Sequence, residues 1–353
     1  MDNTLGKDNL TKEDILFLLD ARDSQEKLFA AADKVRECYI GDEIHIRGII
    51  EFSNYCRNDC LYCGIRRSNL KLKRYRLSPE EIIEIAQNAS NLGYKTVLLQ
   101  SGEDEYYSVD MIEKMIRRIL EKCDCRVALS IGERSIEDYK RFYLAGARRC
   151  LVRFETSNEG LFSKLHPKSS AKKNSLKERI DLLKGLKSIG FQLGTGFMIG
   201  LPDQSSSDIA DDILLLKELG ADMAGIGPFL VHTDTPLKGS SSGDFDLSLR
   251  VIALVRLVCK DIFIPATTAL QTLNMKDGRQ RALRCGANLL MPNITPQKYR
   301  PLYQLYPNKA CVYEAPSDCS ACVRRIITSL GRQVGSGYGD HKDARKKSSG
   351  EKR

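Results

Sequence analysis

The sequence of 353 residues predicts an α/β protein built on a TIM-type (β/α)8 barrel. Short runs rich in β-branched residues alternate with longer segments of helical period, which is the pattern of repeated β/α units. The runs lie between Glu43 and Met291, a span that matches the roughly 250 residues of such barrels. A doubly wound open sheet is the alternative fold. The expected strands are Glu43–Phe52, Thr96–Ser101, Arg126–Ile131, Cys150–Glu155, Phe191–Ile199, Met223–Pro228, Ile262–Thr267 and Asn288–Met291.

Helical periodicity and capping residues predict the helices between these strands. In the clearest case, Ser78 is the expected N-cap, Pro79 takes the first helical position and Gly93 is the stop signal. Amphipathic segments before the first strand add two more helices. The expected helices are Lys12–Ala21, Ser24–Glu37, Pro79–Leu92, Val109–Lys122, Ser135–Ala145, Ser175–Ile189, Ser207–Leu219 and Leu247–Lys260.

The chain is expected to divide into four parts. A helical segment (1–42) precedes the barrel (43–295), and a C-terminal extension that bears cysteines (296–338) follows it. The last part (339–353) has six Lys and Arg against three Asp and Glu, and we expect it to be a disordered basic tail.

Composition indicates a folded cytoplasmic protein, with 42% hydrophobic and 29% charged residues. No stretch approaches the roughly 18 apolar residues of a membrane span, and the N-terminus lacks the apolar region of a signal peptide. The net charge is +9, but Trp is absent and no Arg-rich helix carries interleaved aromatics, so nucleic-acid binding is not expected. Metal binding or catalysis explains clustered cysteines in a reducing compartment better than disulfides do.

The first cysteine group, Cys56, Cys60 and Cys63, forms the pattern C-x3-C-x2-C directly after the first expected strand. Each thiolate can bind one iron of a 4Fe–4S cluster, which leaves the fourth iron open to a chelating ligand. A structural zinc site is the alternative, but it requires a fourth protein ligand, and zinc sites more often show two separated C-x2-C pairs. The spacing therefore favours a redox-active iron–sulfur cluster.

A basic run, Arg66–Arg76, directly follows this group. It could attract an anionic substrate, nucleic acid or an acidic partner protein. A solvated loop beside a site is an equally good interpretation.

Polar residues end several expected strands, and a barrel would gather them at one rim. Gln100 and Glu103 follow the second strand, Ser130 ends the third, and Arg153 and Glu155 end the fourth. Glycine-rich stretches end the next two strands, at 195–201 and 225–227. Glycines at strand ends often only make turns, and a single Arg–Glu pair is often structural, so the order of these residues after the cysteines matters most.

The first cysteine group resembles that of the radical S-adenosylmethionine superfamily, including Tyr62 before the third cysteine and Gly64 after it. The resemblance implies that the amino and carboxylate groups of S-adenosylmethionine bind the open iron. It also implies reductive cleavage to methionine and a 5'-deoxyadenosyl radical. In such enzymes a turn like that of Gln100–Glu103 contacts the methionine amino group. Arg179 is placed to pair with the carboxylate.

A second cysteine group, Cys311, Cys319 and Cys322, forms the pattern C-x7-C-x2-C near the C-terminus. A triad this compact suggests a second iron–sulfur cluster, of the 2Fe–2S or 4Fe–4S type. Its fourth ligand is not evident. A zinc site and three adjacent free thiols are the alternatives.

Further motifs resemble the HydE-type maturases of FeFe-hydrogenase over most of the chain. They are F-S-N-Y-C-R-N-D-C-L-Y-C-G-I-R-R at Phe52, L-Q-S-G-E-D at Leu99, R-F-E-T at Arg153, G-I-G-P-F at Gly225, I-P-A-T-T-A at Ile264, R-C-G-A-N at Arg284, M-P-N at Met291, Y-R-P-L-Y-Q-L-Y-P at Tyr299 and the second cysteine group. By this resemblance, S-adenosylmethionine is held by Tyr62, Gln100, Glu103, Ser130, Glu155 and Arg179, and the substrate pocket is lined by Arg153, Thr267, Thr268, Met291 and Tyr303.

The same resemblance implies a small organometallic substrate, an Fe(CO)2(CN)–cysteine precursor of the hydrogenase's diiron subcluster. It implies partners as well: a tyrosine-cleaving maturase, a scaffold GTPase, and an electron donor such as flavodoxin or ferredoxin. Two alternative functions are a radical amino-acid mutase of the methylornithine synthase type and a non-enzymatic iron–sulfur scaffold.

Overall fold

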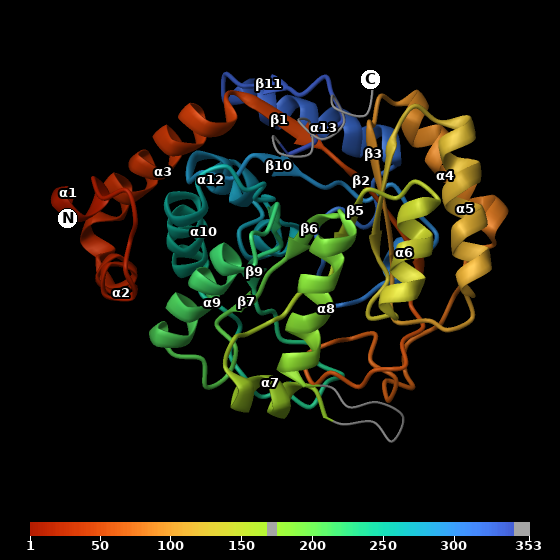
Figure 1. Ribbon diagram of the computed structural model, residues 1–353, viewed down its shortest axis with the longest axis horizontal. Coiled ribbons are helices and arrows are strands. Elements are labelled where there is room, and N and C mark those ends of the chain that lie inside the picture. The colour runs from red at the N-terminus through yellow and green to blue at the C-terminus, as the bar shows by residue number, and fades with distance from the viewer. Residues whose placement is uncertain (168–174, 342–353) are drawn as a thin grey trace.

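A ring of parallel strands with helices outside it forms the body of the protein (Figure 1). The computed structural model describes residues 1–167 and 175–341. Six strands pair in the order β2-β3-β4-β5-β6-β8, and every neighbouring pair is parallel. Their bounds are β2 Gly48–Ser53, β3 Thr96–Ser101, β4 Arg126–Ser130, β5 Arg149–Leu151, β6 Gln192–Thr195 and β8 Met223–Ala224.

The ring closes through short bridges. From β8 the pairing continues by the bridge of Met223 to Phe263 and then by that of Pro265 to Leu289. Leu289 opens β10 (Leu289–Leu290), which pairs in parallel with β1 (Glu43–Ile46). The barrel prediction is therefore confirmed, and the open-sheet alternative is wrong.

Several expected strands are shorter or interrupted. Ile262–Thr267 forms only isolated bridges, because Pro265 has no backbone N–H to donate to a ladder. The first expected strand is split at Arg47 into β1 and β2. The fifth and sixth are each split as well, giving β7 (Met198–Ile199) and β9 (Gly227–Pro228), which pair with each other.

Serine N-caps start the outer helices where the sequence predicts them. Ser78, Ser135, Ser175 and Ser205 each accept a hydrogen bond from the third helical residue, whose carboxylate accepts from the serine N–H in return. The predicted helices appear as α2 Lys12–Asp20, α3 Gln25–Ile40, α4 Pro79–Asn91, α5 Val109–Lys122, α6 Ile136–Leu144, α8 Leu176–Ile189, α9 Ser206–Glu218 and α10 Phe245–Cys259.

Other helices were not expected. They are α1 Asp2–Leu5, α7 Glu159–Leu165, α11 Thr268–Leu273, α12 Gly278–Arg284 and α13 Pro316–Ser329. Most have seven residues or fewer, too short for a helical period to stand out. No helix in the described ranges is long and apolar enough to cross a membrane.

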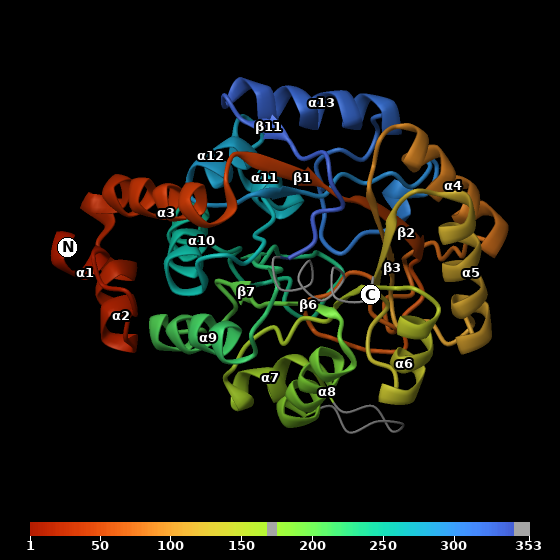
Figure 2. The ribbon, with the colours of Figure 1, turned by 45° about the horizontal axis from the view of Figure 1, so that its top comes forward.

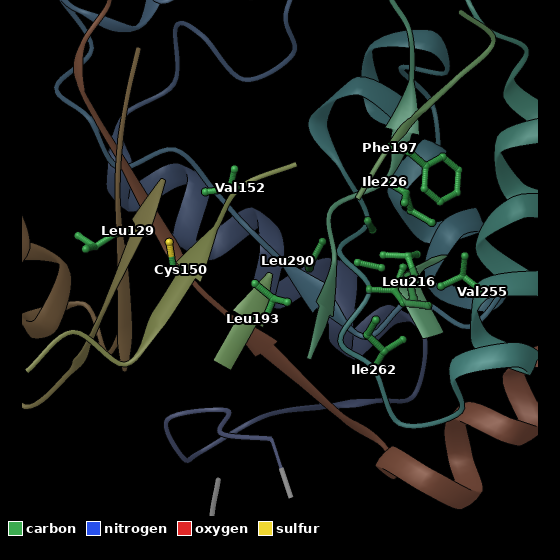
Figure 3. Close-up of a cluster of buried hydrophobic side chains, with 14 of the residues drawn as sticks. Leu129, Cys150, Val152, Leu193, Phe197, Leu216, Ile226, Val255, Ile262 and Leu290 are labelled. Carbon is green, nitrogen blue, oxygen red and sulfur yellow. The ribbon is translucent and has the colours of Figure 1, made fainter. Parts of the chain in front are cut away.

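The N-terminal helices α2 and α3 pack on one side of the barrel against α9 and α10 (Figure 2). Arg250 of α10 donates to the carbonyl of Leu19, at 3.1 Å. Figure 3 shows the apolar layer between strands and helices, in which Leu216 of α9 and Val255 of α10 lie near Ile226 and Ile262. The helical segment is thus an extension of the barrel's outer layer.

The C-terminal strap, Gly335–His341, covers the end of the barrel at which the strands begin. The buried Arg149 donates through Nη2 to the carbonyl of Tyr338 (2.8 Å) and to Oδ1 of Asp340 (2.7 Å). Gln192 also donates to Asp340, at 2.8 Å. Just before the strap, β11 (Gln333–Val334) pairs with β1. The expected disordered tail is therefore wrong for residues 339–341, because Asp340 is the counterion of a buried arginine; residues 342–353 lie outside the described residues.

We predict that Asp340→Asn destabilises the protein by about 3 kcal/mol, because removing one partner of a largely buried pair leaves Arg149 with an uncompensated charge. Chemical denaturation followed by circular dichroism measures the loss. Glu218→Gln, which breaks an exposed pair with Lys184, serves as the control and leaves the transition nearly unchanged. Equal transitions for the two variants would contradict the assigned role of the strap.

Candidate functional site

The three cysteines of the first group lie in the loop between β2 and α4, at the end of the barrel opposite the strap. Arg74 holds this loop in shape through four backbone carbonyls. Its Nη1 donates to Asn54 and to Ile65 (2.8 Å), and its Nη2 donates to Arg66 (2.6 Å) and Asn69 (3.2 Å). The guanidinium therefore fixes the backbone on both sides of the cysteines and adds a positive charge beside their thiols.

The thiols themselves resist ionisation. Burial raises the pKa of Cys63 to about 12 and places that of Cys60 well above its usual range, and it also raises the pKa of Cys56. With raised pKa values, the three thiols stay protonated at neutral pH unless a cation binds them. Metal coordination deprotonates a thiol outright. The Glu103 amide already points at Cys56, with 3.4 Å between its N and Sγ. These features suit an iron–sulfur cluster, whose potential is tuned by hydrogen bonds to sulfur.

Residues 1–167 and 175–341 contain no ligand set for the alternative, a structural zinc site. There, no three His, Cys, Asp or Glu side chains converge on a position for one ion. A cubane cluster has no such requirement, because each thiolate binds a different iron.

Arg153 and Glu155, which follow β5, provide polar groups for a ligand. Their nearest charged atoms, Nη2 and Oε2, are 3.1 Å apart, yet Nε and Nη2 of Arg153 and Oε2 of Glu155 are buried without a hydrogen bond. Glu155 also has a φ of 67°, a left-handed conformation that costs energy in a residue with a side chain. Backbone strain, together with buried charged atoms that lack hydrogen bonds, fits a site that binds a polar ligand such as S-adenosylmethionine.

Two glycines keep the neighbouring backbone bare. A Cβ on Gly196 would lie 2.3 Å from the carbonyl oxygen of Gly225. A side chain at residue 196 would therefore force the backbone there away from that of Gly225. The surface at these two strand ends is therefore formed by main-chain groups, which is what backbone contacts to an adenine require.

Glu103 and Arg179 are bound differently from the expectation. The Glu103 carboxylate accepts from Arg57 Nε (3.0 Å) and from the Glu133 amide (2.9 Å). Arg179 is paired with the Glu133 carboxylate and donates to the Arg153 carbonyl. These two side chains hold the site's frame in this structure, so a direct contact with S-adenosylmethionine stays a prediction for each, as it does for Ser130 at the end of β4.

His166 is a residue that sequence reasoning missed. Its Nε2 lies 3.0 Å from the Tyr62 hydroxyl, and its Nδ1 lies 2.9 Å from the carbonyl oxygen of Phe162. Burial lowers the pKa of His166 to about 4, so the ring is neutral at pH 7: Nδ1 donates to Phe162 and Nε2 accepts from Tyr62. The histidine thus orients the aromatic ring between two cysteines. No sequence signal marked it, because it ends a short helix that was not expected.

The predicted pocket residues fall into two places. Tyr303 is buried in hydrogen-bond contact with Gln100, and Thr267 and Thr268 begin α11 beside Gly227. Met291 instead lines a small cavity of about 20 Å³ at the strap end of the barrel, with Arg47 and Arg149 among its other walls. The full wall of that cavity is Arg47, Leu98, Ala128, Arg149, Cys150, Leu151, Gln192, Gly194, Asp222, Met223, Phe263 and Met291.

A buried charged pair beside Tyr303 was also missed. Glu51 is 2% exposed and is bound by the Lys309 ammonium and by the Asn293 amide at 2.5 Å. Lys309 lies 5.5 Å from the centre of the Tyr303 ring. The pair ties the C-terminal extension to β2, and a lone Glu in a strand gave no warning of it.

The second cysteine group has its thiols beside two arginines. Arg279 Nη1 is 3.6 Å from Cys311 Sγ, and Arg300 Nη1 is 3.4 Å from Cys319 Sγ. Cys319 and Cys322 are three residues apart in α13, so they share one face of that helix. This geometry is compatible with a metal site and does not define its kind.

Comparison with known proteins gives three results that agree. Residues 50–216 match the family model described as the radical SAM superfamily. The chain is 50% identical to the FeFe-hydrogenase maturase subunit HydE of Thermotoga maritima, over 91% of this chain and 90% of that one. It is 28% identical to the 3-methylornithine synthase of Methanosarcina barkeri, over 90% and 88%. A crystal structure of methylornithine synthase matches with a TM-score of 0.80 and 26% identity, covering 95% of this chain and 96% of that one.

We predict that Arg74→Met weakens iron retention about tenfold or more, because supports of a metal-bearing loop commonly have effects of that size. Iron and sulfide content after anaerobic reconstitution measures it. Arg67→Met is the matched control, since Arg67 is exposed in the same loop and its side chain makes no hydrogen bond or ion pair with residues 1–167 or 175–341. Full iron content in the Arg74 variant would refute the role assigned to the guanidinium.

Proposed function

The chain belongs to the HydE family of FeFe-hydrogenase maturases, within the radical SAM superfamily, and we propose that it acts on an organometallic Fe(CO)2(CN)–cysteine precursor of the diiron subcluster. The observation that carries this proposal is 50% identity over 91% of the chain, together with three cysteines on one loop near buried polar atoms that lack hydrogen bonds. Being a radical SAM enzyme, it is not the non-enzymatic scaffold considered from sequence.

Different residues would hold the cluster and S-adenosylmethionine. When bound, a 4Fe–4S cluster supplies the electron that cleaves S-adenosylmethionine to methionine and a 5'-deoxyadenosyl radical. Cys56, Cys60 and Cys63 would hold that cluster. Arg153 and Glu155 would bind polar groups of S-adenosylmethionine with the buried atoms that lack hydrogen bonds, and the backbone at Gly196 and Gly225 would support the adenine.

The substrate would be held by neighbouring donors. Arg153, Thr267, Thr268 and Tyr303 carry one guanidinium and three hydroxyls, which suit a small anionic ligand. The barrel wall and the strap together would exclude water from the radical, because the strap covers the end of the barrel opposite the cysteines. Met291, on the wall of the cavity near that end, would contact the substrate only if the pocket extends that far.

A mutase acting on a free amino acid is the second candidate. It is favoured by one observation, the close agreement in fold with methylornithine synthase. Identity to the methylornithine synthase sequence is 28%, against 50% to the maturase, so the maturase assignment is preferred.

The remaining parts of the proposal concern a second cluster and partners. Cys311, Cys319 and Cys322 would bind a 2Fe–2S or 4Fe–4S cluster away from the first cysteines. A tyrosine-cleaving maturase would supply the substrate, and a scaffold GTPase would receive the product. An acidic redox protein such as flavodoxin or ferredoxin would donate the electron.

We predict that Cys60→Ala abolishes both formation of 5'-deoxyadenosine with dithionite and in vitro maturation of apo-hydrogenase, because two cysteines cannot hold the cluster with its open iron. Chromatography of the adenosine products and hydrogen evolution provide the two readouts. Cys38→Ala, which changes an exposed cysteine of α3, is the control. If the wild-type protein cleaves S-adenosylmethionine but has no effect on maturation, the mutase assignment replaces the maturase assignment.

We predict that Cys319→Ala lowers the iron content but leaves cleavage of S-adenosylmethionine largely intact, because the second group lies in the extension and not on the loop that follows β2. Iron analysis and the 5'-deoxyadenosine assay measure the two effects. Loss of cleavage in a folded variant would show that the second group takes part in the chemistry.

A further inference from the structure

The basic segment after the cysteines is folded onto the loop that carries them. In addition to the four Arg74 contacts, the amide of Arg67 donates to the carbonyl of Asn58, at 2.8 Å, between the first two cysteines. Arg67 follows Cys63 by four residues, which span at most about 14 Å of chain. In Figure 1 the loop between β2 and α4 runs along the lower rim of the barrel, away from β11. Any partner that touches this segment is therefore close to the expected cluster.

The segment carries six positive charges. Three are paired with carboxylates, Arg74 donates to backbone carbonyls, and the other two are exposed. Arg66 pairs with Asp59 at 2.8 Å, Lys71 with Asp234 at 2.8 Å and Arg76 with Asp104 at 2.7 Å. Arg67 and Lys73 are exposed, and neither has an acidic partner within the described parts of the chain. Residues 67–73 therefore form a short arch whose two ends, Arg67 and Lys73, present positive charge to solvent.

The top of the arch and its flank are apolar and aromatic. Leu70 stands between the two cations with 93% of its surface exposed. On the flank, the Arg76 guanidinium lies 3.8 Å from the centre of the Tyr55 ring and 4.7 Å from that of Tyr106, and both rings are exposed. Tyr55 directly precedes Cys56. Tyrosine and arginine are enriched in protein interfaces, and an isolated leucine tip with cations around it is suited to a transient contact with an acidic surface.

We propose that Arg67, Leu70 and Lys73, with the Tyr55–Arg76–Tyr106 stack, form the docking surface for an acidic electron-transfer protein that reduces the first cluster. The proposal rests on the proposed function, because reductive cleavage requires an external electron. Electron tunnelling falls steeply with distance, so the donor must bind over the cysteine loop. Charge complementarity argues for an acidic partner and raises the rate of encounter.

The test compares the rates of 5'-deoxyadenosine formation that two different reductants support, in the wild-type protein and in a variant. Formation of 5'-deoxyadenosine is measured with reduced flavodoxin and, separately, with dithionite, which needs no docking surface. We expect Arg67→Glu combined with Lys73→Glu to slow the flavodoxin-driven rate about tenfold or more and to leave the dithionite-driven rate unchanged. The wild-type flavodoxin rate should also fall with added salt more steeply than that of the variant.

Control variants keep the outcome unambiguous. Lys114→Glu with Lys122→Glu makes the same charge change on α5 and should leave both rates unchanged. Leu70→Ser keeps the charge and should raise the KM for flavodoxin without changing the dithionite rate. Equal flavodoxin rates in wild type and the Arg67/Lys73 variant would overturn the proposal, as would an equal loss with both reductants. Failure of the wild-type protein with dithionite would instead refute the proposed function.

Discussion

Closure of the parallel barrel is the constraint on which the site depends. Because every strand runs in the same direction, residues that follow strands far apart in sequence meet at one rim. The ring is complete only because β10 pairs with β1, and because the segment at Phe263 and Pro265 bridges to β8 on one side and to β10 on the other. Without those short pairings, the cysteine loop after β2 and the Arg153–Glu155 pair after β5 would not meet at the same rim.

Burial then sets the electrostatics of that space. The same desolvation that raises the pKa of Cys63 to about 12 leaves Arg153 and Glu155 with atoms that lack hydrogen bonds. Each feature is unfavourable in the protein alone, and binding of the proposed cluster and of S-adenosylmethionine would offset that cost. The strain at Glu155 and the bare backbone at Gly196 point the same way, since a site built for a ligand carries costs that a structural core avoids.

The sequence predicted those parts of the molecule that depend on local chemistry. The Ser78 cap marked the start of α4, helical periodicity marked the other outer helices, and cysteine spacing predicted the first metal site, because each of these signals lies within a short stretch of sequence. Contacts between distant segments left no local trace. His166 under Tyr62, Lys309 on Glu51 and Asp340 on Arg149 each join residues more than a hundred positions apart. The basic run shows the same limit: its composition suggested a charged surface, whereas Arg66, Arg74 and Arg76 are used within the fold.

The C-terminal extension packs against the barrel beside residues that are predicted to line the substrate pocket. Tyr303 contacts Gln100 of β3, and six residues later Lys309 pairs with Glu51 of β2. Arg279 carries the connection further, since Nη2 donates to the Thr268 hydroxyl at 3.1 Å while Nη1 lies beside Cys311. One guanidinium thus joins a predicted substrate contact to the second cysteine group. A metal bound there would fix Cys311, and through Arg279 it would restrain the wall at Thr268, so the second group can support the pocket without taking part in the chemistry.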